Sequence, residues 1–420
     1  MTDSPTPSDS RPLRLFFAAG EASGDHYAAE LFQRLNTLRP GSVAQGLGGT
    51  ESRAAGIETV VDLNTVSVMG LVEVLRHYGQ LKQALNTLID AMLIFQPDIL
   101  IAIDFQEFNQ RLAKAARARG IKVLFFVAPQ VWAWRPKRAA KFSEVADHLA
   151  VLFDFEVHLF ARYGLPTTHV GHPLRDMIPP ESCKTAITRN VVQAKARHSL
   201  GIAPERKLIG LLPGSRRSEI SRLLCTQLAS AQRLLKAHPD WLFALPIADS
   251  IAPDWFEHEL TKCAISPELR TALTLVNGHA REVMAASDTL IIASGTATLE
   301  AALIGTPMVI VYKTHPITYW LAKHLVHIER IGLPNIVLNR NAFPELIQDA
   351  ASPEAITNEI NGLMLETESR ANQNAALAEI PHHLGEPGAL AHLAQLVLEL
   401  TREAPLATPK LTNQFAVQQR

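Results

Sequence analysis

The chain has 420 residues, of which 47% are hydrophobic and 19% charged, and its formal net charge is −1. One hydrophobic core rarely serves a chain of this length, so we expect two domains. A net charge near zero argues against bulk electrostatic binding of nucleic acid, though not against a local basic patch. No window of about 18 uninterrupted apolar residues occurs, so we expect no membrane-spanning helix.

The termini and the cysteines suggest an ordinary cytoplasmic protein. Residues 1–12 are polar and rich in Ser and Pro, which predicts a disordered tail rather than a signal peptide. Cys183, Cys225 and Cys263 lie far apart and form no CxxC or Cys/His cluster. We therefore expect neither a metal site nor a disulfide framework, and a reducing setting.

Short, almost wholly apolar runs recur along the chain and do not alternate with polar residues. Such runs are typical of parallel strands that are buried on both faces. Amphipathic helical patterns lie between them, which predicts an α/β fold with two doubly wound, Rossmann-like units. The runs are 15–19, 99–103, 123–127 and 149–153, followed by 208–212, 242–245, 290–293 and 308–311.

A proline-rich stretch separates the two sets of runs. Residues 164–183 contain Pro166, Pro173, Pro179 and Pro180, which places the domain boundary near residue 175. The predicted domains are 13–175 and 176–385, and a C-terminal helix with a loose tail covers 386–420. Ligands of open α/β sheets bind beyond the carboxyl ends of the strands, so we expect a cleft between the two facing sheets.

The loop after the first predicted strand is unusually rich in polar and small residues. It contains Gly20, Glu21, Ser23, Gly24 and Asp25 and leads into a helical pattern. A plain turn with Ser23 or Asp25 as helix N-cap is one interpretation. The presence of two carboxylates favours a functional loop instead.

The stretch IDFQEFN (103–109) places Asp104 where a buried strand ends. A carboxylate there could act as a general base toward an acceptor hydroxyl. The alternative is a helix capping box formed by Asp104 and Glu107. The spacing alone does not decide between the two.

Two strand–loop–helix stretches in the second half predict a site for a nucleoside diphosphate. Glycines permit close backbone approach, helix-start amides and Arg216 suit phosphate oxygens, and Glu300 could accept hydrogen bonds from a ribose. Alternatively, the small residues only make room after strands. The candidate residues are Gly214, Ser215 and Arg216 in LLPGSRRSEI and Ser294, Gly295, Thr296 and Glu300 in IIASGTATLEAAL.

Two further segments are candidates for contact with a membrane surface. Residues 66–95 show apolar residues at helical spacing, and Val68, Met69, Val72 and Leu75 form an apolar start to the stripe. Residues 128–142 interleave two tryptophans with basic residues. The alternatives are a helix that packs on the sheet and buried tryptophans beside a solvated basic face.

Eight stretches in a fixed order resemble the lipid-A-disaccharide synthase family, a family of bacterial glycosyltransferases. The resemblance covers about residues 13–400. The stretches are AGEASGD (19–25), VMGLVEVL (68–75), the ID-then-FN frame (103–109), APQVWAWRPKR (128–138), VGHPL (170–174), LPGSRRSE (212–219), SGTATLE (294–300) and LPN (333–335).

This resemblance implies a two-domain glycosyltransferase B fold and an inverting transfer without metal or cofactor. The implied donor is UDP-2,3-diacylglucosamine, and the implied acceptor is 2,3-diacylglucosamine 1-phosphate (lipid X). The products are UDP and the disaccharide 1-phosphate of lipid A. The implied location is the inner face of the cytoplasmic membrane, where the protein binds peripherally, and a homodimer is an open alternative to a monomer.

The resemblance also implies roles for single residues. Asp104 matches the proposed general base, and Glu21 and Asp25 belong to the loop beside the acceptor. Arg216, Glu300 and Asn335 match positions that contact the UDP moiety. The chain departs from the family pattern directly after Asp104, where Phe105, Gln106 and Glu107 replace a small residue, a proline and an aspartate.

Two rival functions remain at this point. One is another UDP-sugar enzyme of the same fold, such as a UDP-N-acetylglucosamine 2-epimerase or the transferase that makes lipid II. The other is a UDP-sugar-binding membrane adaptor without turnover. Lipid dependence would separate the family from an epimerase, and UDP release would separate it from an adaptor.

Overall fold

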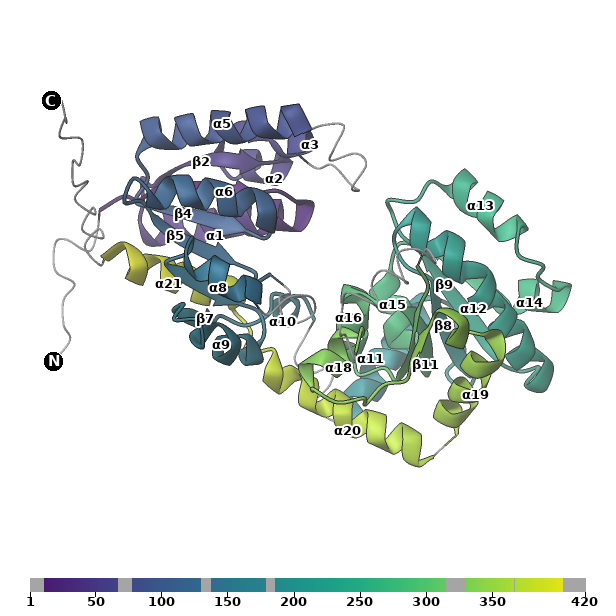
Figure 1. Ribbon diagram of the computed structural model, residues 1–420. Helices are drawn as coiled ribbons and strands as arrows, with labels where there is room; N and C mark the ends of the chain where they lie inside the picture. Colours follow the sequence, from purple (N-terminus) through teal and green to yellow (C-terminus); the bar gives the residue numbers. More distant parts are fainter. Residues whose placement is uncertain are drawn as a thin grey trace, which may run out of the picture. The chain divides into compact units, whose positions relative to one another are not determined.

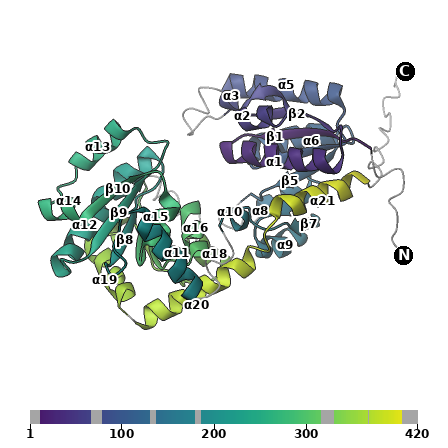
Figure 2. The ribbon, with the colours of Figure 1, turned by 180° about the vertical axis from the view of Figure 1, so that it is seen from behind.

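The chain folds into two compact units, Met1–Gly171 with Gly388–Arg420 and His172–Pro387. The computed structural model describes residues 11–66, 78–129, 137–178, 186–314, 330–365 and 367–402. Each unit contains one parallel sheet with helices on both faces (Figures 1 and 2). The predicted fold class of two doubly wound α/β units is therefore confirmed.

The sheet of the first unit has seven strands in the order β3-β2-β1-β4-β5-β6-β7. The strand order reverses between β1 and β4, because β2 and β3 extend the sheet on one side of β1 and β4 begins the other side. The strands are β1 (Arg14–Ala19), β2 (Val43–Gly48), β3 (Glu58–Asp62), β4 (Ile99–Ile103), β5 (Lys122–Phe126), β6 (His148–Val151) and β7 (Thr167–His169).

Both faces of this sheet are buried, as the apolar runs predict. In β1, Phe16 belongs to one hydrophobic cluster, whereas Leu15 and Phe17 belong to the cluster on the opposite face. This alternation follows from the two-residue repeat of a strand. The helices are α1 (Ala22–Leu38), α2 (Thr50–Ala54), α3 (Leu63–Val66), α5 (Tyr78–Phe95), α6 (Gln106–Arg117), α8 (Lys137–Ser143), α9 (Asp154–Ala161) and α21 (Ala389–Arg402).

The C-terminal helix α21 packs on the first unit, although it follows the second unit in the sequence. Leu393 and Val397 are fully buried in the same cluster as Leu31 of α1. The Lys122 side chain donates a 2.7 Å hydrogen bond to the Leu400 carbonyl. Figures 1 and 2 show this helix in yellow beside α1.

The second unit contains six parallel strands in the order β10-β9-β8-β11-β12-β13. Its order reverses between β8 and β11. The strands are β8 (Leu208–Leu212), β9 (Leu242–Ile247), β10 (Leu273–Asn277), β11 (Thr289–Ala293), β12 (Met308–Tyr312) and β13 (Glu345–Ile347). The helices are α10 (Leu174–Met177), α11 (Ala186–Ser199), α12 (Arg217–Ala237), α13 (Pro253–Thr261), α14 (Pro267–Ala272), α15 (Ala280–Ala286), α16 (Thr296–Ile304), α18 (Leu333–Val337), the 3₁₀ helix η3 (Gln348–Ala350), α19 (Pro353–Met364) and α20 (Glu368–His383).

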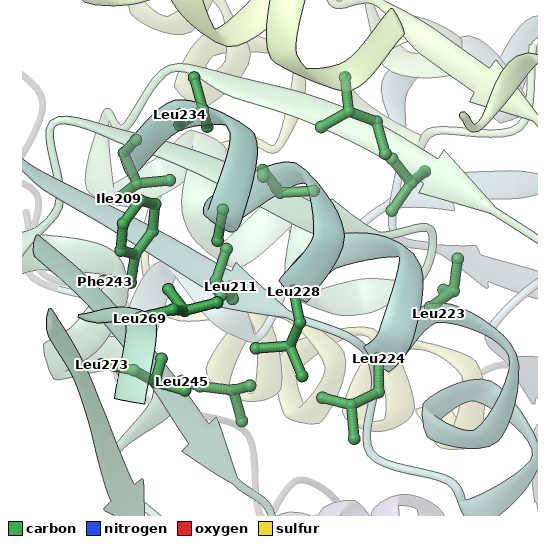
Figure 3. Packing of buried hydrophobic residues seen from close by; sticks show 14 of the residues in the cluster. Ile209, Leu211, Leu223, Leu224, Leu228, Leu234, Phe243, Leu245, Leu269 and Leu273 are labelled. Atoms are coloured by element: carbon green, nitrogen blue, oxygen red, sulfur yellow. The ribbon is translucent and has the colours of Figure 1, made fainter. Parts of the chain in front are cut away.

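Helix α12 supplies much of the core on one face of the second sheet. Its buried Leu224 and Leu228 lie one turn apart, as expected for an amphipathic helix. They pack in one cluster with Leu211 and Phe243 of the underlying strands (Figure 3). This packing fixes the start of α12 directly above the carboxyl end of β8.

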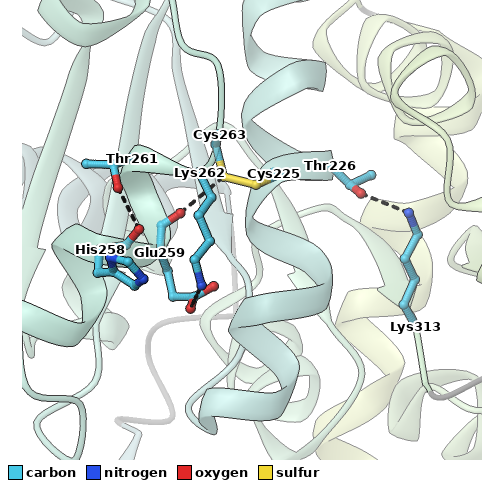
Figure 4. The surroundings of a disulfide bond; sticks show 8 residues. All are labelled: Cys225, Thr226, His258, Glu259, Thr261, Lys262, Cys263 and Lys313. Carbon is cyan, nitrogen blue, oxygen red and sulfur yellow. Dashed lines mark hydrogen bonds and ion pairs between the residues drawn. A yellow bond between two sulfur atoms is a disulfide. The ribbon is translucent and has the colours of Figure 1, made fainter.

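The expectation that no cysteines pair is wrong, because Cys225 and Cys263 form a disulfide. Cys225 lies on α12 and Cys263 follows α13, and their Cα atoms are 5.0 Å apart although 38 residues separate them in the chain (Figure 4). Packing of α13 beside α12 brings the two residues together. Cys183 lies outside the described residues.

We expect reduction of this disulfide to destabilise the second unit. The chain-entropy model gives about 4 kcal/mol for a closed loop of this length. A thermal melt with and without dithiothreitol measures the effect, and the C225S variant should melt like the reduced protein in either buffer. Titration of thiols in denaturant is the control, since three reactive thiols before reduction would contradict the pairing.

The predicted 66–95 helix is represented by α3 and α5, with the intervening residues outside the described part. Leu85, Leu88 and Met92 of α5 are buried against the first sheet, so the packing interpretation holds for residues 78–95. Val68, Met69, Val72 and Leu75 lie outside the described residues, as do both tryptophans of 128–142. Among the described helices, none has the length and apolarity to cross a membrane.

Candidate functional site

In the first unit, the two predicted loops meet at the point where the strand order reverses. Ala19 and Ile103 are paired at the carboxyl ends of β1 and β4, so the loops that follow them are neighbours. A Cβ added to Gly20 would lie 2.2 Å from the Phe105 ring, which explains why the first loop needs glycine there. The structure therefore brings the Gly20–Asp25 loop beside Asp104, at the position where open α/β sheets bind ligands.

The backbone at Asp104 adopts a conformation that side chains disfavour. Asp104 and Phe105 both have a φ of 49°, and Val127 in the neighbouring loop has a φ of 74°. A positive φ costs conformational free energy in residues other than glycine, and it persists only where surrounding contacts hold the backbone in place. The buried Asn109 side chain supplies such contacts, because its Nδ2 donates to the carbonyls of Ala18 at 3.0 Å and Asp104 at 2.8 Å.

The capping-box interpretation of Asp104 and Glu107 is wrong. Helix α6 begins at Gln106, its N-cap is Phe105, and no side chain caps it. Burial raises the pKa of the Asp104 carboxyl, and hydrogen bonds from the Phe105 amide and the Gln106 side chain only partly offset this. A raised pKa brings a carboxylate closer to the range that suits a general base near neutral pH.

The residues that depart from the family pattern after Asp104 have defined places. The Phe105 ring lies 5.1 Å from the Phe108 ring and covers Gly20. The Gln106 side chain donates a 3.1 Å hydrogen bond to the Val127 carbonyl, which links two loops at the same sheet edge. Glu107 is exposed in the first turn of α6. The altered loop is thus packed and hydrogen-bonded around Asp104.

Asp25 is directed toward a neighbouring loop of the same unit. It is 4% exposed, and its carboxylate accepts hydrogen bonds from the backbone amides of Gly49 (2.6 Å), Glu51 (3.0 Å) and Ser52 (3.2 Å). Burial by itself would raise the pKa of Asp25, but the hydrogen bonds from Ser52, Gly49 and Glu51 outweigh that effect. The net result is a pKa below the ordinary value of an aspartate. Asp25 therefore holds the start of α2 at the carboxyl end of β2.

The other residues of the Gly20–Asp25 loop are placed differently. Glu21 is exposed at the N-cap position of α1, and Ser23 is exposed in its first turn. Neither Ser23 nor Asp25 is the N-cap, so the simple-turn interpretation is wrong. Gly24 is buried, and a Cβ there would lie 3.4 Å from Ile103.

Sequence reasoning missed the partner of Asp25. A Cβ on Gly49 would lie 2.6 Å from Asp25 Oδ2, and one on Gly48 would lie 2.6 Å from the Ser52 hydroxyl. The stretch GLGG (46–49) at a strand end was the available signal, because adjacent glycines there mark a close approach to the backbone.

The second unit contains a cavity of about 490 Å³ at the reversal point between β8 and β11. Its wall includes Leu212 at the end of β8 and Ala293 at the end of β11. Seven of the eight predicted UDP-binding residues line it: Gly214, Ser215, Arg216, Ser294, Gly295, Thr296 and Glu300. The structure thus brings together two loops that are about 80 residues apart in the chain.

The start of α12 differs from the sequence expectation in one respect. The backbone amides of Ser215 and Arg216 both donate to Glu219 Oε2, at 3.1 and 3.3 Å, so they are already occupied. Gly214 has a φ of 117° and passes so close to Glu219 that an added Cβ would lie 2.4 Å from its carboxylate. The Arg216 side chain is 72% exposed, lines the cavity and lies 3.7 Å from the other carboxylate oxygen of Glu219.

The start of α16 offers the more open set of donors. Within the described chain, the amides of Thr296 and Ala297 have no hydrogen-bond acceptor, and both residues line the cavity. Ser294 precedes Thr296 by two residues, with Gly295 between them, and donates its hydroxyl to the Ile331 carbonyl at 2.8 Å. Free amides at a helix start attract anions, so this end of the cavity suits a phosphate group.

Three polar cavity residues were not predicted as site residues: Glu219, described above, and Asp249 and His279. Asp249 and His279 follow β9 and β10 and line the same cavity. They lie in loops without a recognisable motif, and the only available signal was their position after a predicted strand. Glu300 also has an unforeseen partner, since the Arg281 guanidinium donates to its carboxylate at 2.7 Å.

Asn335 is absent from the lining of this cavity. Its side chain is fully buried, and its Oδ1 accepts from the Ala342 and Phe343 amides at 2.8 and 2.9 Å. Its Nδ2 donates to the Phe343 carbonyl at 2.8 Å and to Glu345 at 2.7 Å. The amide thus uses both donors and both acceptor lone pairs within the protein.

A sequence profile of the lipid-A-disaccharide synthetase family matches residues 15–396. This range contains every candidate residue described above. The chain belongs to the lipid-A-disaccharide synthetase family. The lipid-A-disaccharide synthase of Trichlorobacter lovleyi is 41% identical over 394 residues, which cover 94% of this chain and 99% of the relative. The corresponding enzyme of Geobacter sulfurreducens is 40% identical over 390 residues, which cover 92% and 97%.

Solved structures show that this family member has the glycosyltransferase B fold. The UDP-GlcNAc 2-epimerase from Neisseria meningitidis, bound to UDP-GlcNAc, matches with a TM-score of 0.60 and 13% identity over 93% of this chain and all of the other. MurG from Acinetobacter baumannii matches with a TM-score of 0.52 and 15% identity over 93% and 99%. At these identities the likeness concerns the fold alone.

Proposed function

We propose that this protein is an inverting glycosyltransferase that makes the lipid A disaccharide. It transfers 2,3-diacylglucosamine from UDP to the 6-hydroxyl of lipid X and releases UDP. The observation that carries this proposal is the cavity at the β8/β11 reversal point, which gathers Arg216, the α16 start and Glu300 in a chain of this family. Phosphate donors and a carboxylate suited to ribose hydroxyls are the groups that a UDP moiety requires.

In the proposed step, the Asp104 carboxylate takes the proton of the acceptor 6-hydroxyl. The hydroxyl oxygen then forms a bond to the anomeric carbon of the donor, while the bond from that carbon to the diphosphate oxygen breaks. UDP leaves with the electron pair of that bond. The Arg216 guanidinium and the helix-start amides of Thr296 and Ala297 stabilise the negative charge that develops on the diphosphate.

The acceptor belongs, in this proposal, to the first unit. Asp104 lies beside the Gly20–Asp25 loop, and Glu21 is exposed at the start of α1, where it can meet an acceptor hydroxyl. Asp25 contributes indirectly, because it holds the neighbouring α2.

We also infer a peripheral position on the inner face of the cytoplasmic membrane. Both substrates of the proposed reaction carry two acyl chains, and an apolar segment with basic neighbours suits a membrane interface. The segment that contains Val68, Met69, Val72 and Leu75 is the candidate for this contact. A homodimer remains an alternative assembly, which sedimentation in detergent would test.

The test is UDP release from UDP-2,3-diacylglucosamine by the purified protein in detergent with EDTA, with and without lipid X. We expect release that requires lipid X and continues in the presence of EDTA. UDP release without lipid X would instead favour a hydrolase or an epimerase-like enzyme. Binding of the UDP-sugar without any release would favour the adaptor.

A further inference from the structure

We propose that Glu345 is a positioning residue for the donor site, although it lies outside the cavity. Glu345 begins β13, the edge strand of the second sheet. Its carboxylate accepts three hydrogen bonds, from the Ile331 amide at 2.8 Å, the Gly332 amide at 3.0 Å and Asn335 Nδ2 at 2.7 Å. The inference rests on the proposed function, because it concerns how the phosphate-binding end of that site is held.

One peptide bond connects Glu345 to the cavity wall. The amide of Gly332 donates to Glu345, and the carbonyl of the same peptide unit, that of Ile331, accepts from the Ser294 hydroxyl at 2.8 Å. A peptide unit is planar, so a hydrogen bond that fixes its N–H also fixes the direction of its C=O. Glu345 thus orients the acceptor that holds Ser294, and only Gly295 separates Ser294 from the first amides of α16, those of Thr296 and Ala297.

The surrounding residues leave this peptide unit little freedom. A Cβ on Gly332 would lie 2.4 Å from the Ile310 side chain and 3.0 Å from Glu345 Oε1, so only glycine permits this approach. Asn335 reaches from Glu345 to the Ala342–Phe343 backbone and ties the two ends of the turn together. This network assigns the LPN stretch (333–335) a role in holding the site rather than in touching the ligand.

The substitution Glu345→Gln tests the proposal with little change in shape. Gln presents one N–H₂ group where the carboxylate presents an oxygen, so at least one of the three donors loses its acceptor. We expect the Kd for UDP, measured by calorimetry, to rise about tenfold, which corresponds to one lost hydrogen bond to a charged group. The KM for lipid X should stay unchanged, because the acceptor binds elsewhere in the proposed function.

Glu379→Gln is the matched control. Glu379 is also a carboxylate bound to this region, through Arg340 at 2.6 Å, but in the described part of the chain its hydrogen bonds do not lead to Ser294, and it lies at the surface. The control should keep the wild-type Kd for UDP. A double-mutant cycle with Ser294→Ala adds a second criterion, since E345Q should cause no further loss once the Ser294 hydroxyl is gone.

The possible outcomes separate the inference from the function on which it rests. If wild-type protein binds UDP and E345Q binds it equally well, the positioning role is wrong and the proposed function stands. If the wild-type protein does not bind UDP, the proposed function fails. Circular dichroism checks that E345Q folds. If it does not, E345D replaces it, because Asp keeps the charge but is one methylene shorter. Wild-type UDP affinity in E345D would overturn the positioning role.

Discussion

Replacing Asp104 by Asn should lower kcat/KM by about a thousandfold while leaving UDP binding unchanged. General-base catalysis typically contributes 10²–10⁴-fold, and the amide of Asn cannot take a proton from the acceptor hydroxyl. In the wild type, burial raises the pKa of Asp104, and the base acts only when deprotonated. Activity should therefore rise with pH and level off above that pKa, at a higher pH than for an ordinary carboxylate. The measurement is lipid X-dependent UDP release across pH.

Glu107→Gln is the matched control for this prediction. Glu107 lies three residues farther along and is exposed in the first turn of α6, so its loss should change kcat/KM only slightly. An equal loss in both variants would mean that Asp104 is not the unique base. Full activity in D104N would contradict the base assignment directly.

Replacing Asp25 by Ala should destabilise the first unit by about 3 kcal/mol. The substitution leaves the backbone amides of Gly49, Glu51 and Ser52 without the acceptor that they have in the wild type. Unsatisfied buried donors cost about 1–3 kcal/mol each where water cannot replace the acceptor. Hydrogen exchange of these three amides measures the local loss, and a thermal melt measures the effect on the unit.

The pH dependence of stability is an independent test of the role of Asp25. The pKa of Asp25 is lowered in the folded protein. The ionised Asp25 carboxylate therefore contributes fully to the stability of the fold above the pKa of an unfolded Asp, about 4. This contribution is lost as the pH falls through the pKa that Asp25 has in the folded protein. D25A should therefore lose less stability than the wild type between about pH 5 and pH 3. Parallel curves for the two proteins would contradict the assignment.

Asp62→Asn is the control for the Asp25 prediction. Asp62 also has a lowered pKa, through hydrogen bonds from Asn64 and Arg53, but its side chain is 36% exposed. An exposed pair of this kind contributes about 0–1 kcal/mol. A loss in D62N as large as that in D25A would show that burial is not what makes Asp25 important.

The two-unit α/β fold and most of the residues that line the β8/β11 cavity could be predicted from the sequence. Runs such as 99–103 and 208–212 are apolar throughout, because a parallel strand covered by helices is buried on both faces. The loops around Arg216 and Ser294 could be found because each follows such a run. Local composition carries this information, and strand ends are where α/β sheets bind ligands.

The tertiary structure decided which contacts the residues of these loops make. Asp25 and Asp104 follow neighbouring strands in the same kind of loop. Only the packing shows that the Asp25 carboxylate binds the amides at the start of α2. Asp104 is instead half-buried with a strained backbone, and burial raises the pKa of its carboxyl. The capping interpretation of Asp104 was equally good from the spacing, because a capping box and a catalytic loop share the same residue types.

Long-range contacts account for what the sequence could not determine. Three such contacts each join residues that are more than ten positions apart: the pairing of Cys225 with Cys263, the packing of α21 on the first unit and the hydrogen bond from the Gly332 amide to Glu345. The sequence by itself determined which segments form strands and helices, because their burial pattern is local. Which side chains meet depends on the strand order and helix packing, and these place residues together without leaving a periodic signal in the chain.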